Sequence, residues 1–352
     1  MRIAAVRLHP YRLPLRRPWT AAATVLVERR GMLVALTDAD GVTGWGDCAP
    51  LPSSGTAGHD AAFAALAAAA QDLSGMTAEA AAERLAAVPL PEPRWALETA
   101  LADLAARRDG LPLARFLGGT GPLAVPVNAA LGPLDAGCAG RAAAALARGF
   151  AIAKIKLGLA DVDTELGRLR ALAAEAGGLR LRLDANRAWA DADAWGFLTA
   201  VADLPIDGVE EPLMEPTLER LAQLQAQLPF VIAVDESLPD LGVDAVLAAP
   251  AVRRLVVKPA RIGGIAATLA LARKAQQAGV ELVLTSVVDS VVGVAAAAHL
   301  AAALPGVGLA HGLATGEWLA TDLGPPLPID GGVMTLPAGA GLGFDPMPPS
   351  GG

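Results

Sequence analysis

A regular spacing of short apolar runs constrains the fold of this 352-residue chain more than any other feature. From about residue 125 onward these runs alternate with segments of helical character, and neighbouring runs end roughly 22 to 28 residues apart. The ends lie near residues 130, 157, 184, 210, 235, 258, 285 and 311. A strand, a loop and a helix fill such a repeat, so the pattern predicts a modified (β/α)8-type, TIM-like barrel of α/β class. A doubly wound open sheet is the structural alternative, although no GxGxxG motif follows the first run.

The residues before the repeat predict a second, smaller domain of α+β class. Residues 1–55 contain apolar runs typical of β-strands, and three alanine-rich segments of helical character follow them. The helical segments cover residues 58–73, 77–87 and 94–108. We therefore expect a capping domain over residues 1–120, completed by the Pro- and Gly-rich tail 324–352, and a barrel over residues 121–323.

Composition and charge limit the partners and the compartment of the protein. The formal net charge of -8 lacks the basic excess that a nucleic-acid partner requires. The start of the chain has no apolar core of a signal peptide, and two isolated cysteines make no disulfide framework, so a reducing cytoplasm is expected. The uncharged stretch 291–316 is interpreted as a helix, a turn and a strand, and no membrane partner is expected. No sequence feature indicates an oligomeric state.

Lysine is rare and occurs at particular places in this chain. Only four of the 28 basic residues are lysine, and three of them, Lys154, Lys156 and Lys258, end apolar strand-like runs. Arginine cannot release its proton in a protein, whereas lysine can. The choice of lysine at these positions therefore indicates proton transfer rather than surface charge.

Carboxylates end three successive runs between these lysines. Asp184, Glu210 and Asp235 are spaced 26 and 25 residues apart. In a parallel barrel such strand ends meet at the C-terminal mouth, where barrel enzymes place their active sites. Oxygen ligands without His or Cys favour a hard cation, so the pattern predicts a Mg2+ site, with Mn2+ as the alternative ion.

One type of reaction uses this combination of groups. Removal of a proton α to a carboxylate creates an enediolate, whose negative charge a divalent cation stabilises. A lysine whose pKa is lowered by nearby positive charge can act as the base near neutral pH. The expected substrate is therefore a small anionic carboxylate.

Each of these residues also has a structural interpretation. A lysine pair can lie on a solvated strand edge, Glu210 at a helix N-terminus, and Asp235 at a helix cap. Five groups in register with the barrel repeat favour a common site instead. Among the other polar residues, Glu211 and Glu236 are interpreted as supporting or helix-start residues and His311 as a structural histidine. Ser286 and Ser290 are candidate substrate contacts, with helix capping as the alternative.

Seven sequence motifs, in order, carry a resemblance to a known family. They are WGDCAPLP, LETALADLAARRDGLPLARFLGG, KIKLG, DANRAW, VEEP, VDES and VKPARIGG. The chain resembles the enolase superfamily, in particular its muconate-lactonising-enzyme subgroup. The resemblance implies that Asp184, Glu210 and Asp235 bind magnesium. It implies that Lys156 is the principal acid/base, Lys154 a helper, and Lys258 the lysine on the opposite wall. It also implies that capping loops near residues 16–24 and 50–58 shape specificity.

The late barrel motifs narrow the implied activity. Thr285-Ser286 stands where racemases of the mandelate type carry a catalytic histidine, and LAHGLAT has no acid where dipeptide epimerases carry Asp-x-Asp. The stretch HGLATGEWLATDL resembles o-succinylbenzoate synthases, which implies dehydration of 2-succinyl-6-hydroxy-2,4-cyclohexadiene-1-carboxylate in menaquinone biosynthesis. N-succinylamino acid racemisation and muconate cycloisomerisation are the alternatives. A catalytically silent anion-binding barrel is the alternative of another class.

Overall fold

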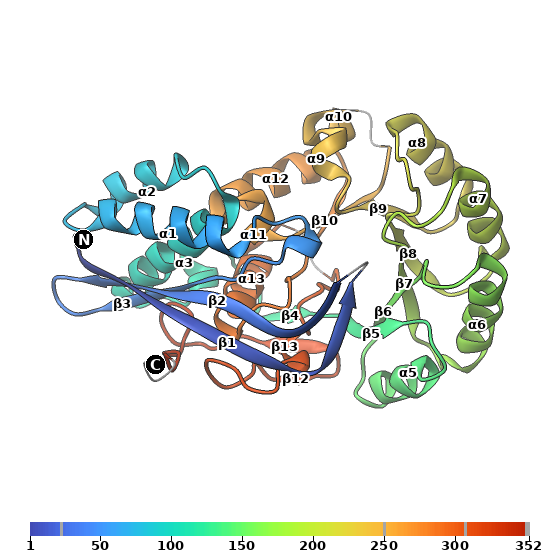
Figure 1. Cartoon of the computed structure of the whole chain (residues 1–352), viewed down its shortest axis with the longest axis horizontal. Coiled ribbons are helices and arrows are strands. Elements are labelled where there is room, and N and C mark those ends of the chain that lie inside the picture. Colours follow the sequence, from blue (N-terminus) through green and yellow to red (C-terminus); the bar gives the residue numbers. More distant parts are fainter. Residues whose placement is uncertain (22–23, 249–250, 306–307, 349–352) are drawn as a thin grey trace.

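The structure, a computed structural model, describes residues 1–21, 24–248, 251–305 and 308–348 (Figure 1). A curled parallel sheet forms a barrel, and its strands follow one another in the order β11-β10-β9-β8-β7-β6-β5. The strands are β5 (Ala129–Pro133), β6 (Ile152–Lys156), β7 (Arg180–Asp184), β8 (Ile206–Glu210), β9 (Val231–Val234), β10 (Arg254–Val257) and β11 (Glu281–Leu284). Each strand ends within a few residues of a predicted run end, so the α/β barrel expectation is confirmed.

The eighth run contributes single bridges instead of a full strand. Val127 pairs with His311, and Thr285 pairs with Gly312, both in parallel, so this segment lies between the first and last strands of the sheet. A Cβ atom on Gly312 would lie 2.6 Å from the Thr285 Oγ1 atom. The close approach that closes the barrel therefore requires glycine at this position.

Helices cover the outside of the barrel, as Figure 1 shows for those on its right side. The longer ones are α5 (Cys138–Ala147), α6 (Val162–Glu175), α7 (Asp191–Ala200), α8 (Leu218–Gln227), α12 (Ile265–Gln277) and α13 (Val291–Ala303), and the short ones are α9 (Leu238–Leu241), α10 (Val243–Ala248) and α11 (Pro259–Ile262). Local caps start several of them; for example, Asp161 accepts the Thr164 N–H at 2.9 Å. Helix α13 is buried from Val291 to Ala301, which explains its apolar sequence. Within the described part of the chain, no helix combines the length and apolar character needed to cross a membrane.

The N-terminal capping domain packs an antiparallel sheet against helices. Its antiparallel strands are β1 (Ile3–Ala21), β2 (Thr24–Asp38) and β3 (Thr43–Cys48), and its helical segments are η1 (Pro52–Ser54), α1 (His59–Leu73), α2 (Ala78–Ala86), α3 (Pro91–Arg108) and α4 (Leu113–Phe116). Glycines allow β3 to lie directly on α3, since a Cβ atom on Gly46 would stand 1.9 Å from the Ala96 carbonyl oxygen. The predicted α+β character of this domain is confirmed.

The C-terminal tail contacts both parts of the molecule. Strands β12 (Ile329–Asp330) and β13 (Val333–Thr335) form a small antiparallel sheet with β4 (Ala124–Pro126), just before the barrel. A 310 turn, η2 (Gly316–Trp318), precedes them. Farther along, the Leu342 N–H donates to Asp103 of α3 at 2.6 Å. The last four positions of the tail, 349–352, lie outside the described residues.

A charged layer fills the barrel interior beneath the mouth. A register shift between β7 and β8 leaves Asp207 without a backbone register partner on β7. Its Oδ2 atom accepts from Arg182 at 2.9 Å and from Arg254 at 2.7 Å, and all three side chains are buried. Burial alone would raise the pKa of Asp207, but the two guanidinium groups outweigh it and lower that pKa. Asp207 therefore holds together two arginines that would otherwise repel each other.

Replacement of Asp207 by Asn should destabilise the fold strongly. The change removes the counter-charge of the buried Arg182 and leaves Arg254, which faces it, with Glu281 alone; breaking a buried ion pair in this way typically costs about 3–5 kcal/mol. Urea unfolding of D207N followed by circular dichroism measures it. The matched control is D203N, because Asp203 is exposed and its contact with Arg170 is 3.6 Å long. Equal unfolding midpoints for the two variants would contradict this account of the layer.

Candidate active site

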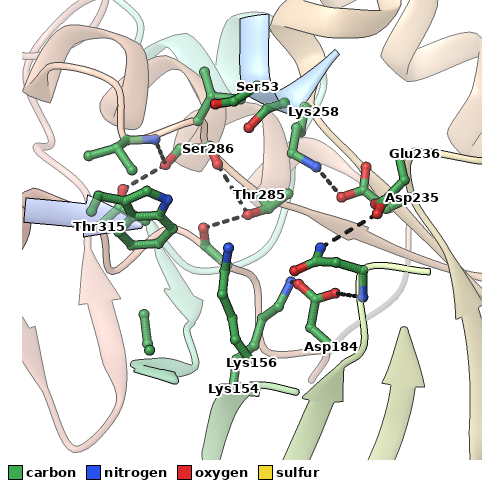
Figure 2. A pocket seen from close by; sticks show the side chains of 18 of the residues that line it. Ser53, Lys154, Lys156, Asp184, Asp235, Glu236, Lys258, Thr285, Ser286 and Thr315 are labelled. Carbon is green, nitrogen blue, oxygen red and sulfur yellow. Dashed lines mark hydrogen bonds and ion pairs between the residues drawn. The ribbon is translucent and has the colours of Figure 1, made fainter. Parts of the chain in front are cut away.

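A pocket opens at the C-terminal ends of the barrel strands (Figure 2). Its cavity is about 440 Å³ in volume. The strand ends supply charged side chains, whereas the capping domain supplies Trp19 and the segment around Leu51 and Ser53. Both predicted capping loops therefore border the cavity, although residues 22–23 of the first loop lie outside the described residues.

The lysines lie where strand parity predicts them. On β6, Ala153 and Ile155 are fully buried, and the alternate residues Lys154 and Lys156 line the pocket. Lys258 follows β10, which is separated from β6 by the three strands β7, β8 and β9. Lys156 and Lys258 therefore stand on different walls, as Figure 2 shows.

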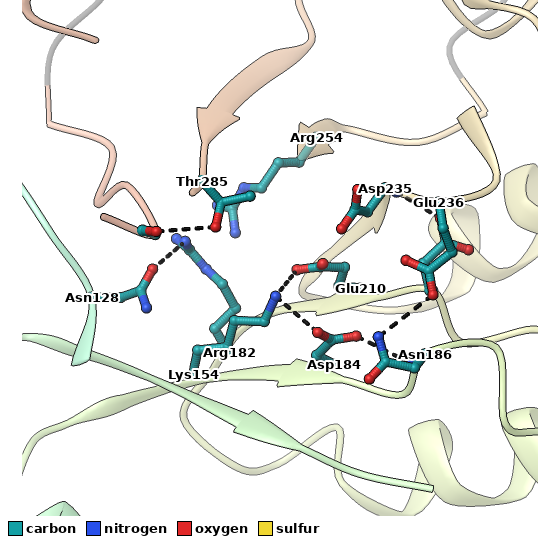
Figure 3. Close-up of polar contacts among 12 residues, drawn as sticks. Asn128, Lys154, Arg182, Asp184, Asn186, Glu210, Asp235, Glu236, Arg254 and Thr285 are labelled. Atoms are coloured by element: carbon teal, nitrogen blue, oxygen red, sulfur yellow. Dashed lines mark hydrogen bonds and ion pairs between the residues drawn. The ribbon is translucent and has the colours of Figure 1, made fainter. Parts of the chain in front are cut away.

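The ammonium group of Lys154 joins two of the carboxylates (Figure 3). Its Nζ atom lies 2.8 Å from an Asp184 oxygen and 2.7 Å from a Glu210 oxygen. Burial alone would lower the pKa of Lys154, but the two carboxylates outweigh that effect and raise it. Lys154 therefore stays protonated, which suits a residue that balances charge and not one that removes protons.

Asp235 pairs with cations on the opposite side of the site. Lys258 donates to one of its oxygens, and Arg261 donates to the other at 3.2 Å. Burial would raise the pKa of Asp235, but the contact with Lys258 and the charges of Lys154 and Arg261 together outweigh burial and lower that pKa. Sequence reasoning missed Arg261; the available signal was its position three residues after Lys258, in the first turn of α11.

The acidic groups fit a hard divalent cation. Oxygens of Glu210, Asp235 and Glu236 lie within 4.8 Å of one another, and the donor set contains no nitrogen or sulfur. The Oε1 atom of Glu210 is buried without a hydrogen-bond partner among the described residues. Burial, and then the charge of Asp184, raises the pKa of Glu210. An unpartnered acceptor in an acidic cluster is relieved when a cation binds.

The positions of Glu236 and Asp184 differ from the predicted ligand set of Asp184, Glu210 and Asp235. Glu236 was expected to support the site, yet its carboxylate belongs to the group of three close acids. Asp184 is outside that group and instead accepts from Lys154 and from the Asn186 N–H, at 3.1 Å. The adjacency of Asp235 and Glu236 after β9 was visible in the sequence, but the turn that brings both inward was not.

Glu211 orients the segment that carries Asp235. One of its oxygens accepts the N–H groups of Asp235 and Ser237, at 2.6 and 2.9 Å. Burial, and then the charge of Glu236, raises the pKa of Glu211 to about 7. Glu211 also has a φ of 48°, which is uncommon for a residue with a side chain. Its contacts are those of a supporting residue, as its strand position suggested.

Lys156 has the surroundings of a base. Burial is the largest effect and lowers the pKa of Lys156; the neighbouring Lys154 charge acts in the same direction, against Asp184. Its Nζ atom lies 5.0 Å from the centre of the Trp19 ring, and no carboxylate of the described residues comes within 4.0 Å of it. Of the two lysines on β6, Lys156 is therefore the one that gives up its proton more readily.

The two candidate serines lie in different surroundings. Ser286 lines the pocket and shares a 2.6 Å hydrogen bond with Thr315. Ser290 is 0% exposed and donates to Asp47 at 2.7 Å, so its side chain offers no surface to a substrate. Ser290 therefore contacts Asp47 instead of the pocket. The sequence could not reveal this, because Asp47 lies 243 residues away along the chain.

The eighth segment forms an uncharged wall of the pocket. Its lining residues are Gly312, Ala314 and Thr315, none of which is acidic. His311 accepts the Leu284 N–H through Nδ1 at 3.0 Å. Burial, and then the charge of Arg182, lowers the pKa of His311 to about 4, so the imidazole is neutral and structural.

Family models match most of the chain. A model described as "Enolase C-terminal domain-like" matches residues 138–349, and one for the "Mandelate racemase / muconate lactonizing enzyme, N-terminal domain" matches residues 3–118. The protein is therefore an enzyme of the enolase superfamily. Within it, the chain belongs to the metal-dependent mandelate racemase and muconate-lactonizing family.

Similar proteins in this family catalyse different reactions. The chain is 32% identical over 303 residues to o-succinylbenzoate synthase of Yersinia enterocolitica serotype O:8, covering 84% of this chain and 86% of that one. It is 32% identical over 256 residues to chloromuconate cycloisomerase CbnB of Cupriavidus necator, covering 71% and 69%. The solved structure of a dipeptide epimerase from Methylococcus capsulatus, complexed with Mg and a dipeptide, is 30% identical, has a TM-score of 0.85, and covers 97% and 99%.

Magnesium should stabilise the folded protein against heat. A ligand that binds only the native state adds about 2.7 kcal/mol of stability at 100 times its Kd. Thermal unfolding with Mg2+ and with a chelator measures this, and E210Q should abolish most of the difference. The control is E219Q, which changes an exposed glutamate of α8 and should keep the full stabilisation by Mg2+. A midpoint insensitive to Mg2+ in the unaltered protein would contradict the assignment of this cluster.

Proposed function

We propose that this protein is a magnesium-dependent o-succinylbenzoate synthase, a carbon–oxygen lyase. It dehydrates 2-succinyl-6-hydroxy-2,4-cyclohexadiene-1-carboxylate through an enediolate, a step of menaquinone biosynthesis. The uncharged pocket wall formed by Gly312, Ala314 and Thr315 is the observation that carries this choice. An acid-free wall suits a substrate without a free ammonium group, because no counter-charge is provided for one. The synthase of Yersinia enterocolitica among the relatives supports it further.

In this proposal Asp184, Glu210 and Asp235 hold the metal, and Glu236 adds a nearby oxygen. When bound, magnesium supplies positive charge that makes the α proton of the substrate carboxylate more acidic and stabilises the enediolate. Lys154, kept protonated between Asp184 and Glu210, offsets the negative charge of the acids and fixes two of them in place.

Lys156 is the proposed acid and base. Its pKa, lowered chiefly by burial, allows its neutral amine to take the α proton. The electron pair of the broken C–H bond then forms a double bond as the neighbouring C–O bond breaks. The ammonium form of Lys156 returns the proton to the departing hydroxyl, which leaves as water. Lys258, on another wall, presents positive charge to the intermediate.

N-succinylamino acid racemisation is the second candidate. The placement of Lys156 and Lys258 on different walls favours it, because racemisation removes a proton from one face and returns one to the other. Its substrate also lacks a free ammonium group. A muconate-cycloisomerase-like reaction is a further alternative within the family. A silent anion-binding barrel is disfavoured, since binding alone gives no role to a desolvated lysine with a lowered pKa.

Replacement of Lys156 by Ala should lower turnover by about 10²-fold to 10⁴-fold, because the proton acceptor is lost. K156R should be equally impaired, because arginine keeps the charge but cannot give up its proton. The control is K274A, which removes an exposed lysine on α12. Steady-state kinetics measure the effect, and near-normal turnover by K156A or K156R would reject the role.

The purified protein should form o-succinylbenzoate only with a divalent cation. Its aromatic absorbance follows the product, and a chelator should stop the reaction. A parallel incubation in deuterated water with an N-succinylamino acid separates the candidates by loss of optical activity and incorporation of deuterium. Racemisation without any synthase activity would replace the first proposal with the second.

A further inference from the structure

A buried arginine of the capping domain contacts two segments that border the pocket. Arg29, on β2, is 1% exposed. It donates to the carbonyl oxygens of Ala49 and Pro50, at 2.5 and 2.9 Å, and to that of Val288 at 3.1 Å. Pro50 leads into the capping loop, and Val288 itself lines the pocket. One guanidinium group therefore fixes two walls of the cavity relative to each other.

A buried aspartate of the same domain holds the other end of the barrel segment. Asp47, on β3, accepts from the Tyr11 hydroxyl at 2.6 Å. Its second oxygen accepts both the Oγ–H and the N–H of Ser290, at 2.7 and 3.2 Å. Ser290 is the residue before α13, and its own side chain does not cap the helix. Asp47 thus places a carboxylate at the N-terminus of α13, beside Asp322, which accepts the Val291 N–H at 2.8 Å.

The segment between these two anchors has a costly backbone conformation. Val288 has a φ of 60°, in the left-handed region, which is an outlier for a β-branched residue. Its N–H donates to the Ser286 Oγ at 3.2 Å, and its carbonyl oxygen accepts from Arg29. Such a conformation persists only when surrounding contacts hold it. Here one contact comes from the pocket and the other from the capping domain.

We infer that Arg29 and Asp47 are positioning residues of the active site. They hold residues 286–290 of the barrel so that Ser286 and Val288 form the pocket wall. Apolar residues would be sufficient to join the two domains, and buried charges at the junction are costly. Hydrogen bonds, however, are directional, so buried donors and acceptors can specify one backbone conformation of the segment. Arg29 and Asp47 are not needed simply to join the domains, because the Ala266 N–H also donates across the junction, to Glu98 of α3 at 3.2 Å.

Hydrogen exchange tests the inference without a substrate. The full-length variants R29M and D47N should exchange the amides of Val288 and Ser290 at least tenfold faster than the unaltered protein. The amides of β7 should be unchanged. The matched control is D72N, because Asp72 is a half-exposed aspartate of the same domain that pairs with Arg84. Unchanged exchange of the 286–290 segment in both R29M and D47N would overturn the inference.

Turnover provides a second test, which rests on the proposed function. Val288→Gly removes the conformational strain that the contact with Arg29 stabilises, because glycine adopts a positive φ freely. R29M should therefore lower kcat at least tenfold in the parent but less than threefold in the V288G background. Equal losses in the two backgrounds would show that Arg29 acts only on overall stability and would reject its positioning role. If the unaltered protein turns over none of the candidate substrates, the proposed function fails, and the exchange result still decides the inference.

Discussion

The ammonium group of Lys154, shared between Asp184 and Glu210, is the interaction on which the rest of the site depends. Parallel strands in a barrel end at one mouth, so acids at the ends of adjacent strands are forced into a common volume. Without buried cations their mutual repulsion would drive them to protonate. Lys154 on one side and Lys258 with Arg261 on the other offset part of this repulsion, while the pKa of Glu210 remains raised until a further cation binds. Lys156 has no such ion pair, so burial is the largest effect on it and lowers its pKa.

The two domains contribute different kinds of residues to the pocket. The barrel supplies the charged groups, because its strand ends converge, whereas the capping domain supplies Trp19 and lining residues between Leu51 and Gly55. Buried polar contacts join them at the segment after β11, where Asp47 caps α13 from outside its own sequence. The relatives share the fold but differ in reaction, which agrees with chemistry built into the barrel and specificity built into the walls.

Periodic features of the chain were predictable from its sequence, and contacts between distant segments were not. Strand ends and the inward direction of Lys154 and Lys156 follow from spacing and parity, which are local properties. In the described part of the eighth segment, isolated bridges replace the expected full strand, and the glycine that lies against Thr285 was not recognised from the sequence. The inward turn of Glu236, the ion pair of Arg261 and the burial of Ser290 against Asp47 depend on loop geometry and long-range packing. The spacing of Lys258 and Arg261 is visible in the sequence, but no local pattern shows the inward turn of Glu236 or the contact of Ser290 with Asp47.

The central claim is that acids from three adjacent strands bind one divalent ion between Lys156 and Lys258. A crystal structure of the magnesium-loaded protein tests it most directly. We expect one ion bound by oxygens of Asp184, Glu210 and Asp235, at about 2.0–2.1 Å for Mg2+. We also expect both Lys156 and Lys258 to face the space beside it. An ion bound elsewhere, or a site in which Lys154 keeps both of its carboxylate contacts and no ion binds at saturating magnesium, would contradict the account.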